Sequence, residues 1–483
     1  MGGRLYRELT MRNHTWKLSV FASLLTLGFL AAPVCATDGS PEAQWVEGTL
    51  LIAWGTPLSV LDEASPIVAS LRQDEGKMVH LELDEGLLAA VGGPMAAPGR
   101  RVRALIPVRD PGMGDAPVRP LAITAEGGVP EASETASGSY PYVSIMCQFQ
   151  GNSSNLVSLS YFQGMYANVW PGLDHYWRRL SYGMVNVVGS SAVGWFTLPH
   201  TQAYYEGLIS GTNYSIMLNA LYNDCTSAAS GSVNLSNYEG INLMFNDTFG
   251  PYAWGGWGGV TWEPPWGWGN VAVICHEMGH AFGLPHSNNA DGDSSPYDNP
   301  WDIMSNSWGS AMSDGTYGTV GKHTITYHKD RLGWIPAARK AVVSTAGLYE
   351  FNIDHLTFAG TSNLHMVKVM IPGSTRFYTI EVRDRFGYDG NLPGFAVILH
   401  EVNSSRQEPA WLVDLVDPSN GGDAGAMWRP GECFEDAPNE ISICVESITT
   451  EGFTVRVGYG DWGGIFDDGF EAGNLGAWSL VTN

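Results

Sequence analysis

The sequence predicts an α+β fold, with strands and helices in its first part and a β-sandwich-like domain after them. Two patterns indicate this class: short apolar runs between turn residues toward both ends of the chain, and an apolar helical stretch at 271–282. With 483 residues, 44% of them hydrophobic, the chain can build about two to four domains.

Residues 1–36 have the pattern of a secretory signal peptide. Four basic residues (Arg4, Arg7, Arg12 and Lys17) precede an apolar run at 18–32, and the small residue Ala36 suits the cleavage site. The alternatives are a retained membrane anchor and a lipid-modified Cys35. The apolar run is shorter than the roughly 20 residues that a membrane span requires, so we expect a secreted protein, free or associated with the cell surface.

The charge excludes a generally basic nucleic-acid binder. Lys plus Arg number 25 and Asp plus Glu 49, so 25 − 49 gives −24. Removing residues 1–36 takes away four basic residues and Glu8, and the remaining 21 − 48 gives −27. After the apolar run at 18–32, no stretch of the sequence is apolar enough to span a membrane. The sequence does not indicate the oligomeric state.

The elements follow in order along the chain. Residues 37–110 alternate short apolar runs with turns, as a small β-rich unit does, and 111–139 is a Pro-, Gly-, Ala-, Ser- and Glu-rich stretch typical of an exposed linker. Because such linkers are easily cut, we interpret 37–110 as a propeptide of a zymogen, with an ordinary N-terminal domain as the alternative.

Residues 140–335 read as one compact domain, with strands expected at 142–149 and 241–245 and a helical stretch at 156–180. Residues 336–460 read as a β-rich C-terminal domain. Its expected strands are 367–371, 377–382, 396–402, 411–416, 441–445 and 453–457. An acidic, Gly-rich tail at 461–483 resembles tails of exported bacterial proteins.

Five cysteines remain after export, namely Cys147, Cys225, Cys275, Cys433 and Cys444. An odd number in a compartment that permits disulfides leaves at least one thiol unpaired. Cys433 and Cys444 flank a short segment between two expected strands, so we predict that they pair. The pairing among the other three stays open.

Residues 271–286 read VAVICHEMGHAFGLPH and contain H-E-x-x-H-x-x-G-x-x-H, formed by His276, Glu277, His280, Gly283 and His286. Two histidines four residues apart lie on one face of a helix, close enough to share a metal ion. Gly283 can end the helix and Pro285 prevents its continuation, so His286 can return as the third ligand.

Three neutral imidazoles leave the fourth position of tetrahedral zinc open to water, which is the arrangement of a catalytic site. Cys275 is not expected to be a ligand, because it does not lie on the helix face that His276 and His280 share. Glu277 is the expected general base, which takes a proton from the attacking water and later protonates the leaving amine. Because the ligands must be neutral, activity should collapse in acid.

This long motif resembles that of the metzincin clan of zinc metalloendopeptidases. The resemblance implies a catalytic domain with a mixed sheet and an active-site helix, one zinc ion, and protein or peptide substrates. It also implies a methionine turn beneath the metal, for which WDIMSNS supplies Met304 as a structural residue. Some members carry a tyrosine two residues later; here that position is Asn306, so such a tyrosine is not expected.

Within the clan, the stretches 176–189, 327–335 and 377–402 are similar to gametolysin-like and immune inhibitor A-like peptidases. Many metzincins are held latent by a propeptide cysteine, but no cysteine lies between residues 37 and 146, so another contact must inhibit the precursor. The resemblance also suggests 260–262 as the edge strand that pairs with substrate; the alternative is a rigid aromatic loop.

Some interpretations stay open. Asp291, Asp293, Asp298 and Asn299 precede Met304 and form either a calcium site or a solvated acidic loop. Two rival functions are an adhesive protein on an inactive scaffold and a zinc amidase that acts on cell-wall material. An inactive scaffold has no need to keep Glu277 and the three histidines, all of which are intact, and an end-group assay on cell-wall material would separate an amidase from a peptidase.

Overall fold

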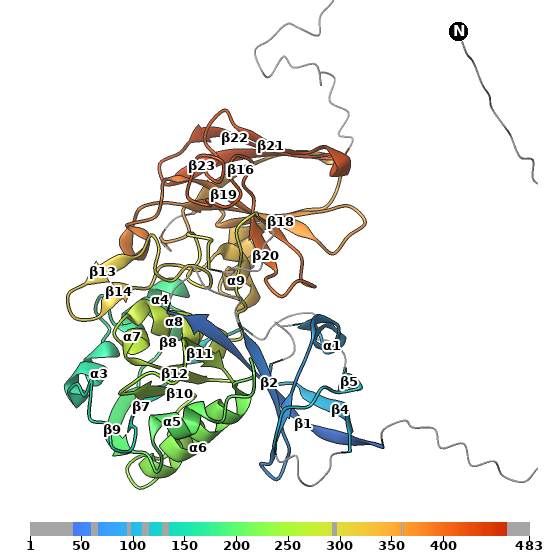
Figure 1. Cartoon of the computed structure of the whole chain (residues 1–483). Helices are drawn as coiled ribbons and strands as arrows, with labels where there is room; N and C mark the ends of the chain where they lie inside the picture. The colour runs from blue at the N-terminus through green and yellow to red at the C-terminus, as the bar shows by residue number, and fades with distance from the viewer. Residues whose placement is uncertain are drawn as a thin grey trace, which may run out of the picture. The chain divides into compact units, whose positions relative to one another are not determined.

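The computed structural model describes residues 42–58, 66–93, 98–108, 115–127, 135–291, 297–358, 360 and 362–460. The predicted signal peptide (1–36) and acidic tail (461–483) lie outside these ranges. The described residues combine helices with sheets, in agreement with the α+β prediction (Figure 1). Within them, we find no helix with the length and apolar character that crossing a membrane would require.

The N-terminal strands form a small unit around their own apolar core. Its elements are β1 (Ala43–Pro57), β2 (Ile67–Arg72), β3 (Met78–Leu81), α1 (Glu85–Ala90), β4 (Arg101–Pro107) and β5 (Ala122–Ala125). β5 lies within the segment expected to be an exposed linker, and it pairs with β4. Val118 and Ile123 of that segment are buried in this core, so part of 111–139 belongs to the N-terminal unit.

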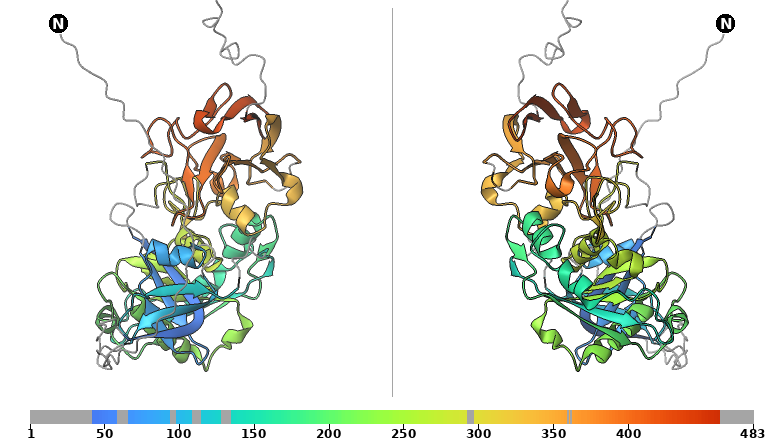
Figure 2. Two further views of the ribbon diagram at one scale, coloured as in Figure 1. Left: turned by 90° about the vertical axis from the view of Figure 1, so that its right-hand side faces the viewer. Right: turned by 90° about the vertical axis from the view of Figure 1, so that its left-hand side faces the viewer.

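The middle of the chain forms a mixed sheet that the N-terminal strands extend. Its strands are β7 (Tyr142–Gln148), β9 (Ser191–Thr197), β10 (Gly240–Phe245), β11 (Tyr252–Gly256) and β12 (Val260–Glu263). The order across the sheet is β3-β2-β1-β11-β12-β10-β7-β9. β7, β9, β10 and β12 pair in parallel, whereas β11 runs antiparallel to both β12 and β1. The side views show the blue N-terminal strands beside the green strands (Figure 2).

The helical stretch expected at 156–180 is two short helices, α3 (Leu159–Met165) and α4 (Leu173–Leu180). Pro171 lies between them, and a proline lacks the backbone N–H that a continuous helix needs there. The other helices are α5 (Gln202–Glu206), α6 (Ser215–Ala229), α7 (Pro265–Trp268), α8 (Val271–Ala281) and α9 (Thr326–Arg331). Short strand pairs are β6 (Gly138–Ser139) with β8 (Val185–Asn186), and β13 (Met312–Asp314) with β14 (Gly318–Val320).

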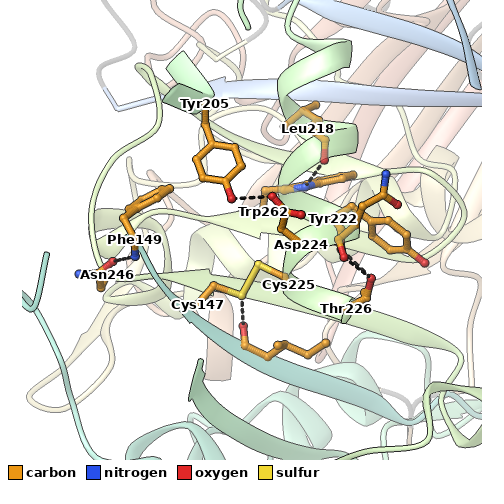
Figure 3. Close-up of a disulfide and its surroundings, with 12 residues drawn as sticks. Cys147, Phe149, Tyr205, Leu218, Tyr222, Asp224, Cys225, Thr226, Asn246 and Trp262 are labelled. Atoms are coloured by element: carbon orange, nitrogen blue, oxygen red, sulfur yellow. Dashed lines mark hydrogen bonds between the residues drawn. A yellow bond between two sulfur atoms is a disulfide. The ribbon is translucent and has the colours of Figure 1, made fainter. Parts of the chain in front are cut away.

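A disulfide between Cys147 of β7 and Cys225 of α6 fastens that helix to one face of the sheet (Figure 3). Nearby, Trp262 of β12 donates a hydrogen bond to the Leu218 carbonyl of the same helix. The bridge joins residues 78 apart, which on chain-entropy grounds stabilises the fold by about 4 kcal/mol. Cys275 is a buried free thiol.

Two further sheets share one core in the C-terminal part, as the β-sandwich-like prediction expects. One has β15 (Lys340–Val343), β17 (Met366–Met370), β18 (Phe377–Arg383), β19 (Ala396–Val402) and β20 (Ala410–Leu412). The other has β16 (Gly347–Asp354), β21 (Cys433–Asp436), β22 (Ile441–Ile448) and β23 (Gly452–Tyr459). The predicted disulfide Cys433–Cys444 joins β21 to β22 and is confirmed.

Candidate metal centre

The three motif histidines meet in one buried cluster. His276 and His280 lie on α8, which begins after Asn270. Gly283 has φ 82°, a left-handed conformation that ends the helix and turns the chain, as the sequence predicts. The turn brings His286 back, so that the three Nε2 atoms lie 3.0–3.1 Å from one another.

The Nδ1 atoms of the two helical histidines face backbone carbonyls. His276 Nδ1 lies 2.6 Å from the Ile303 oxygen, and His280 Nδ1 lies 2.7 Å from the Leu284 oxygen. A backbone carbonyl can only accept a hydrogen bond, so Nδ1 of each ring carries the proton and donates it in that bond, which leaves the Nε2 lone pair free to bind a metal. His276 and His280 are therefore oriented with Nε2 toward the centre of the cluster, as metal ligands require.

Burial keeps these imidazoles neutral. It lowers the pKa of His276 to about 4, and burial followed by the effect of neighbouring imidazoles holds the pKa of His280 and His286 well below the usual value. Tetrahedral zinc with Zn–N bonds of about 2.0–2.1 Å needs ligand nitrogens about 3.3 Å apart, close to the separations observed. The donor set thus fits a metal ion, and these three residues can hold one.

Glu277 follows the first histidine and is fully buried. Within the described part of the chain, neither of its carboxylate oxygens has a hydrogen-bond donor in bonding geometry. Burial raises its pKa well above the usual value, the Glu263 carboxyl raises it further, and the nearby Thr56 hydroxyl opposes this without reaching hydrogen-bonding geometry. A buried carboxyl group without a donor is costly and is typical of a functional position.

Glu263, at the end of β12, is a second buried carboxyl that the sequence analysis did not single out. Burial raises its pKa to about 8. Its only sequence signal is a lone acidic residue in an aromatic and Gly-rich stretch, and that signal gives no hint of its nearness to Glu277.

Met304, which the resemblance assigned to a methionine turn, packs against α8, the helix that carries His276 and His280. A Cβ atom on Gly279 would come within 2.3 Å of the Met304 sulfur, so the two are in direct contact. Asp302 fixes this turn: its carboxylate accepts hydrogen bonds from the Met304 amide (3.0 Å) and the Ser287 hydroxyl (2.8 Å). The same turn places the Ile303 carbonyl next to Nδ1 of His276.

The C-terminal domain supports the same turn. The buried Arg383 of β18 donates a hydrogen bond to the Trp301 carbonyl and pairs with Asp389 (2.8 Å) and Glu381 (3.2 Å). The Asn299 side-chain nitrogen lies 3.0 Å from His400 Nε2 of β19. Residues of the C-terminal domain therefore help to hold the turn that lies beside the three histidines.

Replacing Arg383 with leucine should lower the free energy of unfolding by about 3–5 kcal/mol, because Glu381 and Asp389 would lose their buried partner. Urea unfolding followed by tryptophan fluorescence measures the change. Arg456→Leu is the matched control, because its ion pair with Glu446 is partly exposed and should contribute no more than about 1 kcal/mol. Equal losses in the two variants would contradict this role for Arg383.

The prediction that residues 260–262 form the edge strand of the sheet is wrong. Residues 260–262 belong to β12, which is paired on both sides, with β10 and β11. The strand at that side of the mixed sheet is β11, and β1 of the N-terminal unit pairs with it. β11 lies directly on α8, because a Cβ on Gly255 would come within 2.3 Å of the Glu277 carbonyl oxygen.

The acidic segment before Met304 is described only in part, because Asp293 lies outside the described residues. Asp298 accepts a hydrogen bond from the Asn289 amide, and Asn299 contacts His400 and the Trp301 amide. A calcium ion there stays a prediction. The Cys275 sulfur lies next to Gly321 and is not part of the histidine cluster.

A scan against known protein families found no match to this chain, and neither did a search of curated proteins.

Proposed function

We propose that this chain is a secreted zinc metalloendopeptidase of the metzincin type. The observation that carries the proposal is the convergence of three neutral imidazoles at 3.0–3.1 Å, next to a buried carboxyl group on the same helix. A structural zinc site would fill all four ligand positions, usually with cysteine among them. Here three histidines form the whole cluster among the described residues.

His276, His280 and His286 would hold the zinc ion. A zinc ion bound there would lower the pKa of a water molecule toward 7 and polarise the carbonyl of a peptide bond. Nitrogen ligands suit zinc, and the carbonyls of Ile303 and Leu284 keep two of the rings oriented toward it.

Glu277 would move the protons. Its carboxylate accepts a proton from the attacking water and delivers it to the amide nitrogen as the C–N bond breaks, which gives a free carboxylate and a free amine. Burial raises the pKa of this carboxyl, so it binds the proton more tightly than an exposed glutamate would. β11 would align an extended substrate by backbone hydrogen bonds.

Secretion is supported by the disulfides Cys147–Cys225 and Cys433–Cys444, since such bonds persist in oxidising compartments. The predicted signal peptide leads to the same conclusion.

The substrate class is tested by incubating the processed protein from the culture medium with casein and with cell-wall material. We expect new amino termini in casein and none in the cell-wall fraction. New end groups only in the cell-wall fraction would favour the amidase alternative. Binding to surfaces without cleavage of either would favour the adhesive alternative.

A further inference from the structure

Three consecutive residues of β1 lie against the metal centre. The Trp54 ring stacks on the His280 ring, with centroids 4.9 Å apart and planes inclined by 8°. The Gly55 carbonyl accepts a hydrogen bond of 2.7 Å from the Tyr297 hydroxyl. The Thr56 hydroxyl lies near the Glu277 carboxyl. Residues 54–56 of β1 therefore reach a proposed metal ligand, the proposed base and a side chain beside them.

Tyr297 belongs to the walls of this site. Its ring packs edge-on against the His286 ring, with centroids 5.0 Å apart, and lies 6.2 Å from the His276 ring. The Gly55 carbonyl that Tyr297 binds thus lies within the same enclosure as the imidazoles. The resemblance gave no reason to expect a tyrosine at this position.

The strand lies on the sheet as a bound peptide does. β1 runs antiparallel to β11, with Ala53 opposite Gly256 and Pro57 opposite Tyr252. Because β12 covers the other side of β11, β1 takes the edge that an extended peptide would add to. Alternate side chains of a strand share a face, so Trp54 and Thr56 both point toward the centre while Gly55 presents its backbone.

With β1 in this position, the three-histidine centre is closed to solvent. Trp54 and Thr56 are each 1% exposed, and Glu277 and His280 are no more exposed than they are. No side chain from β1 replaces a histidine, and the N-terminal unit has no cysteine to bind a metal. The strand therefore blocks the centre by filling the space that a substrate needs.

The segment is also tied to the rest of the N-terminal unit. β1 pairs with β2 along 49–54, and the Gly55 amide donates a hydrogen bond of 2.9 Å to the Pro66 carbonyl. Because Leu50, Ile52 and Trp54 share the core of that unit, the segment cannot leave the site without disturbing the unit.

We propose that β1, at residues 53–57, occupies the place of an extended peptide substrate and keeps the metal centre closed until the N-terminal unit is displaced. The statement that β1 takes the place of a substrate rests on the proposed peptidase function, whereas the closure of the metal centre does not. A peptide that binds the open site in this way would run antiparallel to β11 and could stack an aromatic side chain on the His280 ring.

The test uses full-length chains loaded with zinc: wild type, Trp54→Ala and Trp45→Ala. Trp45 is the matched control, because it lies on the same strand and is 46% exposed, away from the centre. Two rates are measured for each chain, the transfer of zinc to a coloured chelator and the hydrolysis of a fluorogenic peptide. We expect Trp54→Ala to release zinc at least tenfold faster than wild type and to gain peptide hydrolysis, and Trp45→Ala to behave as wild type.

Faster zinc release without hydrolysis would uphold the closure and count against the peptidase. Equal zinc release from all three chains would overturn the closure, whatever their activity. Because Trp54→Ala removes a core side chain and could prevent folding, Tyr297→Phe serves as a second variant. It removes only the hydroxyl that holds the Gly55 carbonyl, and it should speed zinc release by a smaller factor; no change in a folded Tyr297→Phe chain would contradict the proposal.

Discussion

Glu277→Gln should lower kcat/KM for peptide hydrolysis by about 10²- to 10⁴-fold, the range that general acid–base catalysis contributes. Glutamine has the same shape, but its amide cannot accept the proton. Since Glu277 is not among the clustered ligands, the variant should keep one metal ion per chain. Hydrolysis of a fluorogenic peptide and metal content by mass spectrometry are measured in chains opened by Trp54→Ala.

Glutamine at this position should not harm the fold, because it removes a buried carboxyl group that lacks a hydrogen-bond donor. The melting temperature should therefore stay level or rise. Glu239→Gln, an identical change at an exposed position, is the matched control and should retain full activity. Full activity in Glu277→Gln, or loss of its metal, would refute the assignment of the base.

His286→Ala should abolish stable metal binding and, with it, hydrolysis. His286 supplies one of three Nε2 donors and lies outside α8, so the helix should remain intact. Loss of groups that only orient ligands typically weakens metal affinity by about 10- to 100-fold, and loss of a ligand should exceed that. Competition with a chelator of known affinity measures the change.

His200→Ala is the matched control for this prediction. His200 stacks on Tyr204 and is outside the metal cluster, so its replacement should leave metal affinity unchanged. Tight binding of one metal ion by His286→Ala would contradict the three-histidine site.

The sequence predicted the parts of the site that local spacing determines. Helical periodicity places His276 and His280 on one face of α8, and Gly283 with Pro285 returns His286 to them within a few residues. Met304 contacts Gly279 of α8, and its role as a methionine turn stays a prediction from the family resemblance.

The parts that depend on distant segments could not be predicted in this way. The pairing of β1 with β11 joins residues about 200 positions apart, so no local pattern reveals it, and 260–262 was wrongly expected at the edge. For the same reason, the sequence did not choose Cys225 as the partner of Cys147, although it predicted the local Cys433–Cys444 bridge.

Side chains that complete the centre from other elements were missed as well. Tyr297 and Glu263 reach it from a loop and a strand whose positions depend on the whole sheet. Arg383 reaches the methionine turn from the C-terminal domain, and its sequence neighbourhood reads only as a β-strand.

A zinc titration of the metal-stripped Trp54→Ala chain, with casein cleavage followed by the appearance of new amino termini, tests the proposed zinc peptidase centre. If the three histidines form a zinc-dependent peptidase centre, cleavage should be absent in the stripped chain and rise to a plateau at one zinc ion per chain. Cleavage that persists without metal, or a fully zinc-loaded chain with an accessible centre that cleaves nothing, would contradict it.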